Sequence, residues 1–280
     1  MRRFLILLIV ITPFVISAKK KKGKDISLFS SWGYNRAFFS KSAIHFIGEE
    51  YDFTLKSTSA KDRQSPLSAK NYLNLSNLTI PQYNFCLGIL LPNDISISIG
   101  QDHMKYVVSA YSTAILNGYT HIHDEFEGDY NNQEIVITPD FLQYEHTDGL
   151  NYVHVSLNKE KQLLQSNNKN ASLSVNIGIH GGLVIPRSDI TLMHFERNNR
   201  FHVAGYGMGI NAGIKSVFLR YCFLKLENKM GYINMPDILT RGIEYSDRAK
   251  QAFKFIEFYY SFGVQCPLQM KFRKRINTQF

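Results

Sequence analysis

The chain has 280 residues and a formal net charge of +9, and 44% of its residues are hydrophobic, 13% aromatic and only 20% charged. This composition is too apolar for a disordered chain, and three cysteines are too few for a disulfide-stapled scaffold. Beyond residue 18, no apolar stretch approaches the roughly 18 to 20 residues that a spanning helix needs, which excludes a helical membrane bundle. One domain fits the length, because β-barrels of more than about 200 residues form single units.

The amino terminus has the features of an export signal. A basic pair at residues 2–3 precedes an apolar run over residues 4–15, and small residues follow at 17–18, where a signal peptidase could cut. Residues 1–18 are therefore predicted to be a signal peptide that is cleaved after export. The alternative is a membrane anchor that the mature protein retains, although the apolar run is short for a spanning helix.

Basic residues gather at both ends of the mature chain. Residues 19–25 form a basic N-terminal tail, and residues 267–280 form a basic C-terminal tail. Basic runs can bind nucleic acid, but an exported chain seldom meets any, and no zinc-finger spacing or RNA-binding aromatic signature accompanies these runs. We interpret the tails as solvated segments that contact anionic lipid headgroups, and we expect no nucleic-acid partner.

Between the tails, apolar residues alternate with polar or small ones at every second position, a period that is typical of β-strands. In chain order, the predicted strands lie near residues 26–39, 43–56, 83–91, 95–99, 103–122, 134–145, 150–158, 173–179, 188–196, 206–214, 216–229 and 256–264. The predicted loops are the polar segments 56–80, 123–133, 159–170 and 234–250. Pro92-Asn93-Asp94 is predicted to be a hairpin turn. The pattern predicts an all-β fold of roughly 10 to 12 antiparallel strands in one domain, residues 26–266.

The composition of the two strand faces favours an up-and-down transmembrane β-barrel. In residues 173–179 one face holds Leu, Val and Ile, and the other holds Ser, Asn and Gly rather than the Lys and Glu of a soluble sheet. Lipid accepts such an apolar face, and every backbone group in lipid must be paired, so we expect the strands to close into a barrel. The alternative is a soluble exported barrel of the lipocalin type with an apolar pocket.

Three stretches carry a resemblance. They are Ser31–Lys41 (SWGYNRAFFSK), Gly100–Val107 (GQDHMKYV) and Phe141–Tyr152 (FLQYEHTDGLNY). They resemble an uncharacterised family of outer-membrane β-barrel proteins of Bacteroidetes-type bacteria, and the similarity extends from about residue 26 to about residue 265. The resemblance implies a barrel in the bacterial outer membrane, and it supplies no catalytic residue.

Two polar clusters interrupt the predicted strands, and they consist of Asp102, His103 and Lys105 in the first and Glu145, His146, Asp148 and Asn151 in the second. Charged groups in a low-dielectric setting need partners, so we predict that the clusters meet in the barrel interior as a structural network. The alternatives are an acid/base or cation site and a chance separation in space. No metal-binding motif is present, and we expect neither a metal nor a cofactor.

His154 and Ser156 lie two residues apart, on one face of a predicted strand, and could pair a base with a nucleophile. The spacing resembles that of outer-membrane lipid A deacylases. However, the sequence continues Leu-Asn-Lys-Glu over 157–160, without the Asn-Ala continuation, and a carboxylate in the expected later strand is missing. We therefore interpret His154 and Ser156 as ordinary polar residues on the interior face of a strand, and the catalytic pair as the alternative.

The sequence thus predicts a non-enzymatic outer-membrane barrel with a structural, ligand-binding or solute-passing role. The alternative is a lipid-modifying hydrolase, of the esterase or deacylase type, in the same fold. Under either hypothesis, the expected partners of the protein are outer-membrane lipid and lipopolysaccharide, together with the barrel-assembly machinery during insertion, and we expect a monomer.

Overall fold

The computed structural model describes residues 26–77, 79–122, 125–242 and 245–268. In these residues the chain forms a single antiparallel sheet of fourteen strands. The all-β class predicted from the sequence is confirmed. The predicted signal peptide, the N-terminal tail and most of the C-terminal tail lie outside the described residues.

Eight of the described strands close into a ring, because the first pairs with the last. In ring order they are β1 (Ile26–Phe39), β5 (Tyr83–Leu91), β6 (Ile95–Val108), β9 (Leu142–Gln165), β10 (Ser172–Leu192), β12 (Gly205–Phe218), β13 (Cys222–Leu239) and β14 (Arg248–Leu268). Each ring strand is antiparallel to its neighbours. The fold is therefore an up-and-down barrel, as predicted.

The ring holds fewer strands than the 10 to 12 predicted, for two reasons. Some predicted strands are parts of one long strand, since 95–99 and the start of 103–122 both belong to β6, and 173–179 and most of 188–196 both belong to β10. Similarly, β9 runs without interruption through Lys159 and Glu160, where a loop is predicted. Glu160 continues the strand because its carboxylate lies inside the ring, 3.6 Å from the ammonium of Lys215. Other predicted strands leave the ring and form a separate part of the sheet.

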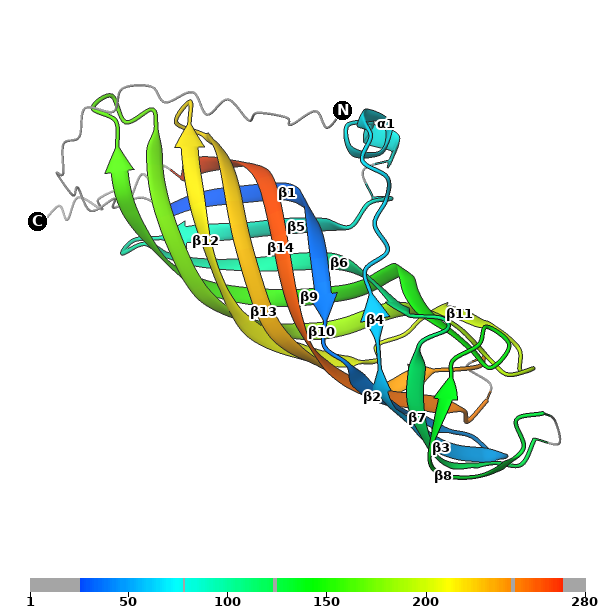
Figure 1. The fold of residues 1–280 in the computed structure, drawn as a ribbon. Coiled ribbons are helices and arrows are strands. Elements are labelled where there is room, and N and C mark those ends of the chain that lie inside the picture. The colour runs from blue at the N-terminus through cyan, green and yellow to red at the C-terminus, as the bar shows by residue number, and fades with distance from the viewer. Residues whose placement is uncertain (1–25, 78, 123–124, 243–244, 269–280) are drawn as a thin grey trace, which may run out of the picture.

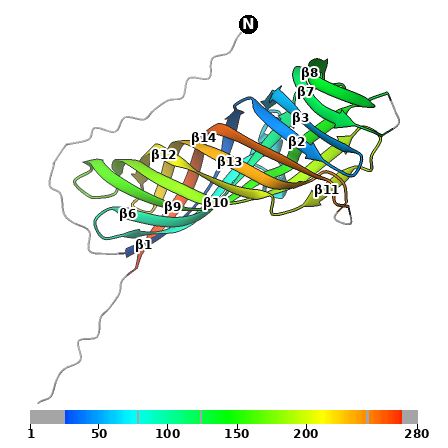
Figure 2. The same cartoon turned by 90° about the horizontal axis from the view of Figure 1, so that it is seen from below.

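That part, which we call the extension, continues the long ring strands beyond one end of the ring (Figures 1 and 2). Its strands are β2 (Ser42–Ile47), β3 (Tyr51–Thr58), β4 (Ala60–Lys61), β7 (Thr113–Thr120), β8 (Gly128–Val136) and β11 (Asn198–Phe201). β2 pairs with the first residues of β14, and β3, β7 and β8 follow outward from it. The opposite end of the ring has only short turns.

One of those turns joins β5 to β6 through the predicted residues Pro92, Asn93 and Asp94. Asn93 and Asp94 have φ angles of 73° and 62°, in the left-handed region. Asn and Asp adopt this region more readily than other non-glycine residues, because their short polar side chains hydrogen-bond locally. The hairpin turn predicted at these residues is therefore confirmed, and the residue types suit its left-handed backbone conformation.

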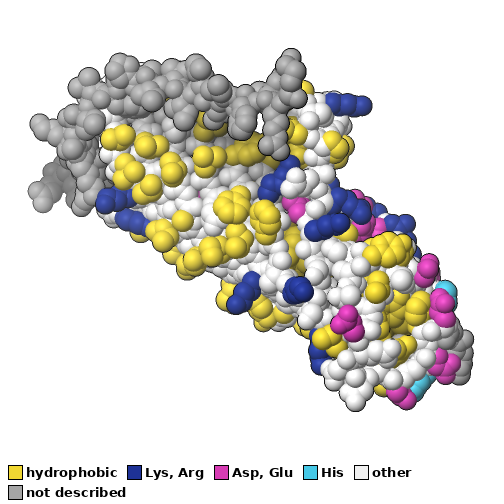
Figure 3. Space-filling model, viewed as in Figure 1, with side chains coloured by type: hydrophobic (Ala, Val, Ile, Leu, Met, Phe, Trp, Pro, Cys, Tyr) yellow, Lys and Arg dark blue, Asp and Glu magenta, His cyan; other side chains and the backbone are white. Residues whose placement is uncertain are grey.

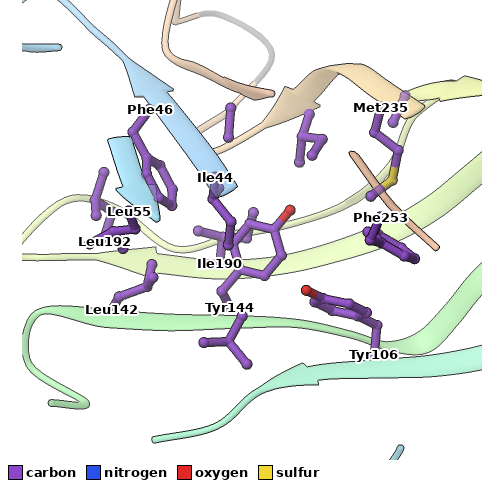
Figure 4. Close-up of a cluster of buried hydrophobic side chains, with 14 of the residues drawn as sticks. Ile44, Phe46, Leu55, Tyr106, Leu142, Tyr144, Ile190, Leu192, Met235 and Phe253 are labelled. Atoms are coloured by element: carbon purple, nitrogen blue, oxygen red, sulfur yellow. The ribbon is translucent and has the colours of Figure 1, made fainter. Parts of the chain in front are cut away.

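The core of the extension is apolar and aromatic, unlike the interior of the ring. Figure 4 shows part of it, with Phe46 and Leu55 from the added strands facing Tyr144, Ile190 and other side chains of the long ring strands. Each of these four residues is at most 2% exposed. A sheet that buries one face in this way is stabilised by about 25 cal/mol for each Å² of apolar surface removed from water.

Between β4 and β5 the chain forms an arm, residues 62–82, of which residue 78 is not described. The arm contains helix α1 (Ala69–Tyr72) and the short 3-10 helix η1 (Leu75–Asn77). Ser68 caps α1, since its hydroxyl accepts a hydrogen bond from the Asn71 amide. Figure 1 places α1 outside the ring, on the side of β1 and β5. No helix among the described residues is long and apolar enough to cross a membrane.

Candidate functional site

The two faces of the ring wall differ in the way that the alternation predicts. On β10, Ile177 points outward and is 64% exposed, whereas Asn176 points inward and is 5% exposed. Glycines on the inner face make room for larger polar neighbours: a Cβ on Gly100 would lie 2.7 Å from the His154 ring. Polar side chains therefore fill the ring interior, which is the candidate functional site.

The centre of this interior is an ion pair that spans the ring. Asp102 on β6 and Lys229 on β13 lie 2.5 Å apart, and four steps of the eight-strand order separate their strands. Asp102 is 1% exposed and Lys229 is 3% exposed. Asn84 donates to the Asp102 carboxylate at 2.6 Å and to Glu257 at 2.8 Å. The pair thus joins opposite walls, and hydrogen bonds complete its surroundings.

A second group crosses the ring at the boundary with the extension. Tyr144 on β9 donates to the side-chain oxygen of Gln251 on β14 at 2.9 Å, and the Gln251 amide donates to Tyr106 at 2.6 Å. These residues too lie on opposite walls. Side-chain contacts therefore connect opposite walls of the ring at two heights, at its centre and at its boundary with the extension.

A third group lies nearer the short turns. Glu227 accepts hydrogen bonds from Asn176 at 2.8 Å and from Tyr259 at 2.5 Å, and it forms an ion pair with Lys225. Lys215, which pairs with Glu160, also lies over the rings of Phe29 and Phe223. Each of the three lysines inside the ring is thus paired with a carboxylate.

The two catalytic candidates lie beside the central ion pair. Ser156 is 3.0 Å from Nδ1 of His154, and Nε2 of the same ring is 3.1 Å from Asp102 and 3.0 Å from the Lys229 ammonium. The structure therefore supplies a carboxylate for a serine–histidine–aspartate set, from an earlier strand than the deacylase pattern uses.

The surroundings of His154 oppose nucleophilic catalysis by this set. Its Nε2 lies within hydrogen-bond reach of both the Lys229 ammonium, which can only donate, and the Asp102 carboxylate, which can only accept. Lys229 and Asp102 also bond directly to each other, so the histidine does not have the carboxylate to itself, and Ser156 is only 5% exposed.

The other predicted residues are distributed over three separate places, and only Asp102 belongs to the central network. His103 and Asn151 contact each other on the outer wall at 2.9 Å, where the His103 ring also stacks on Tyr83. Lys105 donates to the Ile80 carbonyl of the arm at 2.8 Å. These contacts connect neighbouring outer-wall residues and the arm.

The rest of the second predicted cluster is divided between the surface and the core of the extension. Glu145 pairs with Arg63 at 2.9 Å and Asp148 with Arg187 at 2.8 Å, both at the surface. His146 is fully buried among aromatic residues, with ring centroids 5.0 Å from Tyr144 and 5.9 Å from Tyr106. No side chain of the described residues hydrogen-bonds its two ring nitrogens.

His146 predicts a pH dependence of stability. Burial lowers its pKa from 6.5 to about 3, because the apolar core disfavours the charged ring. Only the unfolded chain takes up a proton between those values, so this residue makes the free energy of unfolding fall by about 1.4 kcal/mol for each pH unit below 6.5.

Denaturation curves at pH 7.5, 6.5 and 5.5 would measure this effect. His146→Leu is the control, because it keeps an apolar side chain of similar volume and removes the titrating group. In the variant, the free energy of unfolding should fall less steeply with decreasing pH, because the His146 contribution is absent. An identical slope in both proteins would contradict the assignment.

Sequence reasoning missed Lys229, Glu257 and Asn84. A signal for the first of them is present, since Glu227 and Lys229 stand two positions apart in a strand whose other positions include Leu226 and Met230. Two charges on one strand face indicate an interior position. The sequence around them does not show which residues of the opposite strand they pair with.

Among the described residues, no group of three or more His, Cys, Asp or Glu side chains is arranged to hold a metal ion. His103 and His146, the histidines of the predicted clusters, lie on the outer wall and in the extension core.

Comparison with known proteins gives likeness of fold at low similarity. No family model and no curated protein matches the chain, so the resemblance to a Bacteroidetes-type family stays a prediction. Neisserial surface protein A matches with a TM-score of 0.35 and 10% identity over 87% of this chain and 97% of its own. Outer membrane protein OprG from Pseudomonas aeruginosa matches with a TM-score of 0.35 and 6% identity over 88% and 97%. Outer membrane protein AlkL, solved in lipid bilayers, matches with a TM-score of 0.35 and 10% identity over 91% and 96%.

Proposed function

We propose that the chain is an integral β-barrel protein of the bacterial outer membrane, without enzymatic activity. The observation that supports this most is a belt of exposed apolar side chains around the whole ring. Each ring strand contributes, for example through Leu28, Leu87, Ile99, Val155, Ile177, Met208, Leu226 and Phe258. Soluble monomers rarely expose apolar surface so continuously, whereas a lipid-facing barrel wall requires it.

Polar residues border the belt on both sides. Lys159 and Arg220 lie near the short turns, and Arg36, Lys105 and Lys254 lie toward the extension. On the face in Figure 3, hydrophobic side chains spread over the ring, and acidic ones gather mainly over the extension. Outer-membrane barrels have short periplasmic turns and longer outer loops, so we orient the extension toward the cell exterior.

The filled interior supports a structural or ligand-binding role over solute passage. The Asp102–Lys229 pair and the Tyr144–Gln251 hydrogen bond both join opposite walls. Beyond them the apolar core closes the extension. A solute would have to break both bridges, and leaving one buried charge alone costs about 3 to 5 kcal/mol.

The proposal is tested by location and conductance. The protein should fractionate with the outer membrane, shift in gel migration on heating, and produce no stepwise current in planar bilayers. Recovery as a soluble periplasmic protein without detergent would contradict the membrane assignment, and steady channel currents would contradict the closed interior.

The hydrolase remains a second candidate because Ser156, His154 and Asp102 are in contact. If the set is structural, Ser156→Ala should leave the lipid A and phospholipid composition of producing cells unchanged. It should lower the free energy of unfolding by about 1 to 3 kcal/mol, since Nδ1 of His154 loses its buried hydrogen-bond partner. Mass spectrometry of extracted lipids makes the distinction: a lipid species that disappears in the variant would support the enzyme.

A further inference from the structure

A cavity of about 800 Å³ lies on the outer wall of the ring. Side chains from β10, β12, β13, β14 and β1 line it, together with the arm. The principal lining residues are Tyr34, Leu67, Tyr72, Ile214, Leu226 and Tyr260. The lining is mostly apolar or aromatic, so the cavity offers contact to hydrocarbon.

The strand register explains why a hollow forms there. One row of outward side chains, joined across neighbouring strands, is Val175, Ile214, Leu226, Tyr260 and Tyr34. In the next row toward the extension, Ala212 and Asn228 are neighbours and lie between Ile177 and Phe258, and a row of larger side chains with Ile210 and Met230 follows. Two smaller residues on β12 and β13, surrounded by larger ones, leave a hollow in the wall, which we call the furrow.

The furrow is diagonal to the barrel axis. Val175 is the fourth residue of β10 and lies close to a short turn, whereas Tyr34 is the ninth residue of β1. Because the strands tilt in a barrel, a row across them rises from the short-turn side of the belt toward the arm. The lining residues therefore run from the short-turn side of the belt toward the arm.

The arm closes the upper end of the furrow. Tyr34 donates to the Tyr72 carbonyl at 2.9 Å, and Arg36 donates to the Tyr72 hydroxyl at 2.9 Å. The Tyr34 and Tyr72 rings also meet edge to face, with centroids 4.9 Å apart. Leu67, held near this anchor, lines the cavity although 86% of it is exposed.

We propose that the furrow binds one acyl chain of a bilayer lipid, which the arm holds against the wall. The inference rests on the proposed membrane location, because the furrow is continuous with the lipid-facing belt. Its apolar lining suits a hydrocarbon chain, and its course along the belt suits a chain that enters from the leaflet near the arm. The polar groups of Arg36 and Tyr72 lie at that end, where a lipid headgroup begins.

Two pairs of variants test the site. Ala212→Phe fills the floor of the furrow with an apolar group, and Val155→Phe makes a comparable change on β9, whose residues do not line the cavity. Leu67→Asp places a charge beside the acyl chain, and Leu73→Asp places one on another highly exposed arm residue that does not line the cavity. Each protein is inserted into vesicles of phosphatidylethanolamine and phosphatidylglycerol, extracted in mild detergent and weighed intact by native mass spectrometry.

We expect the original protein, Val155→Phe and Leu73→Asp to retain one lipid, and Ala212→Phe and Leu67→Asp to lose it. Equal retention by all five proteins, or no retained lipid in a barrel that shows heat-modifiable migration, would overturn the acyl-chain site and leave the proposed function standing. A dimer mass that Ala212→Phe abolishes would identify a second copy as the occupant and overturn the inference too. Failure of the original protein to insert would overturn both proposals.

Discussion

Replacing Lys229 by Met should lower the free energy of unfolding by about 3 to 5 kcal/mol, because the Asp102 carboxylate stays buried without its cation. Removing both charges should cost less, since Asp102→Leu together with Lys229→Met also takes away the carboxylate that the single change leaves without its cation. Urea unfolding in lipid vesicles, followed by tryptophan fluorescence and gel migration, measures the difference between the single and the double variant.

Lys225→Met serves as the matched control for this pair. Lys225 also pairs with an interior carboxylate, but its side chain is 19% exposed, and Glu227 keeps hydrogen bonds from Asn176 and Tyr259 when the lysine is lost. The loss should therefore be smaller than for Lys229→Met. If the single and double changes at the central pair are equally costly, the ion pair does not govern stability.

Replacing Ile177 by Arg should lower the free energy of unfolding in vesicles by about 2 to 4 kcal/mol, because Arg at the midplane of a lipid-facing wall is that costly. Ile177 is the outward residue of β10 on which the membrane assignment can be tested most directly, since it is 64% exposed. The measurements are folding yield and heat-modifiable migration after insertion, followed by urea unfolding.

Val136→Arg is the control for this substitution. Val136 ends β8 in the extension and is 50% exposed, so Arg there should remain in water at little cost. An inward position on β10 is not a suitable control, because Asn176 donates to Glu227 and Arg would disturb the packed interior. Equal tolerance of Arg at Ile177 and at Val136 would argue that the ring does not lie in lipid.

The alternation in the sequence contained the fold class and the facing of the strands, as Asn176 and Ile177 illustrate. The same alternation also argues against one part of the hypothesis that both polar clusters meet in the barrel interior. Asp102 and His103 are adjacent in one strand, and successive side chains of a strand point to opposite faces, so both cannot lie in the interior. The structure puts the first inside the ring and the second on the outer wall.

The number of strands in the ring could not be obtained in the same way. Phe46 and Leu55 alternate with polar residues just as the ring strands do, yet β2 and β3 bury their apolar face in the extension. Periodicity reports that a face is apolar, and it does not distinguish lipid from a protein core. The sequence around Asp102 does not identify its partner either, because Lys229 follows 127 residues later.

The closure of the ring by β1 and β14 determines when the barrel can exist. These strands are the first and the last of the described chain, and they join Ile26 to Leu268 in register. Until the final strand has been synthesised, the growing sheet has two open edges whose unpaired amides and carbonyls lipid would not accept. The ring can therefore close only after β14 has been synthesised, so any factor that holds the chain before then must protect the free edges of β1 and β13.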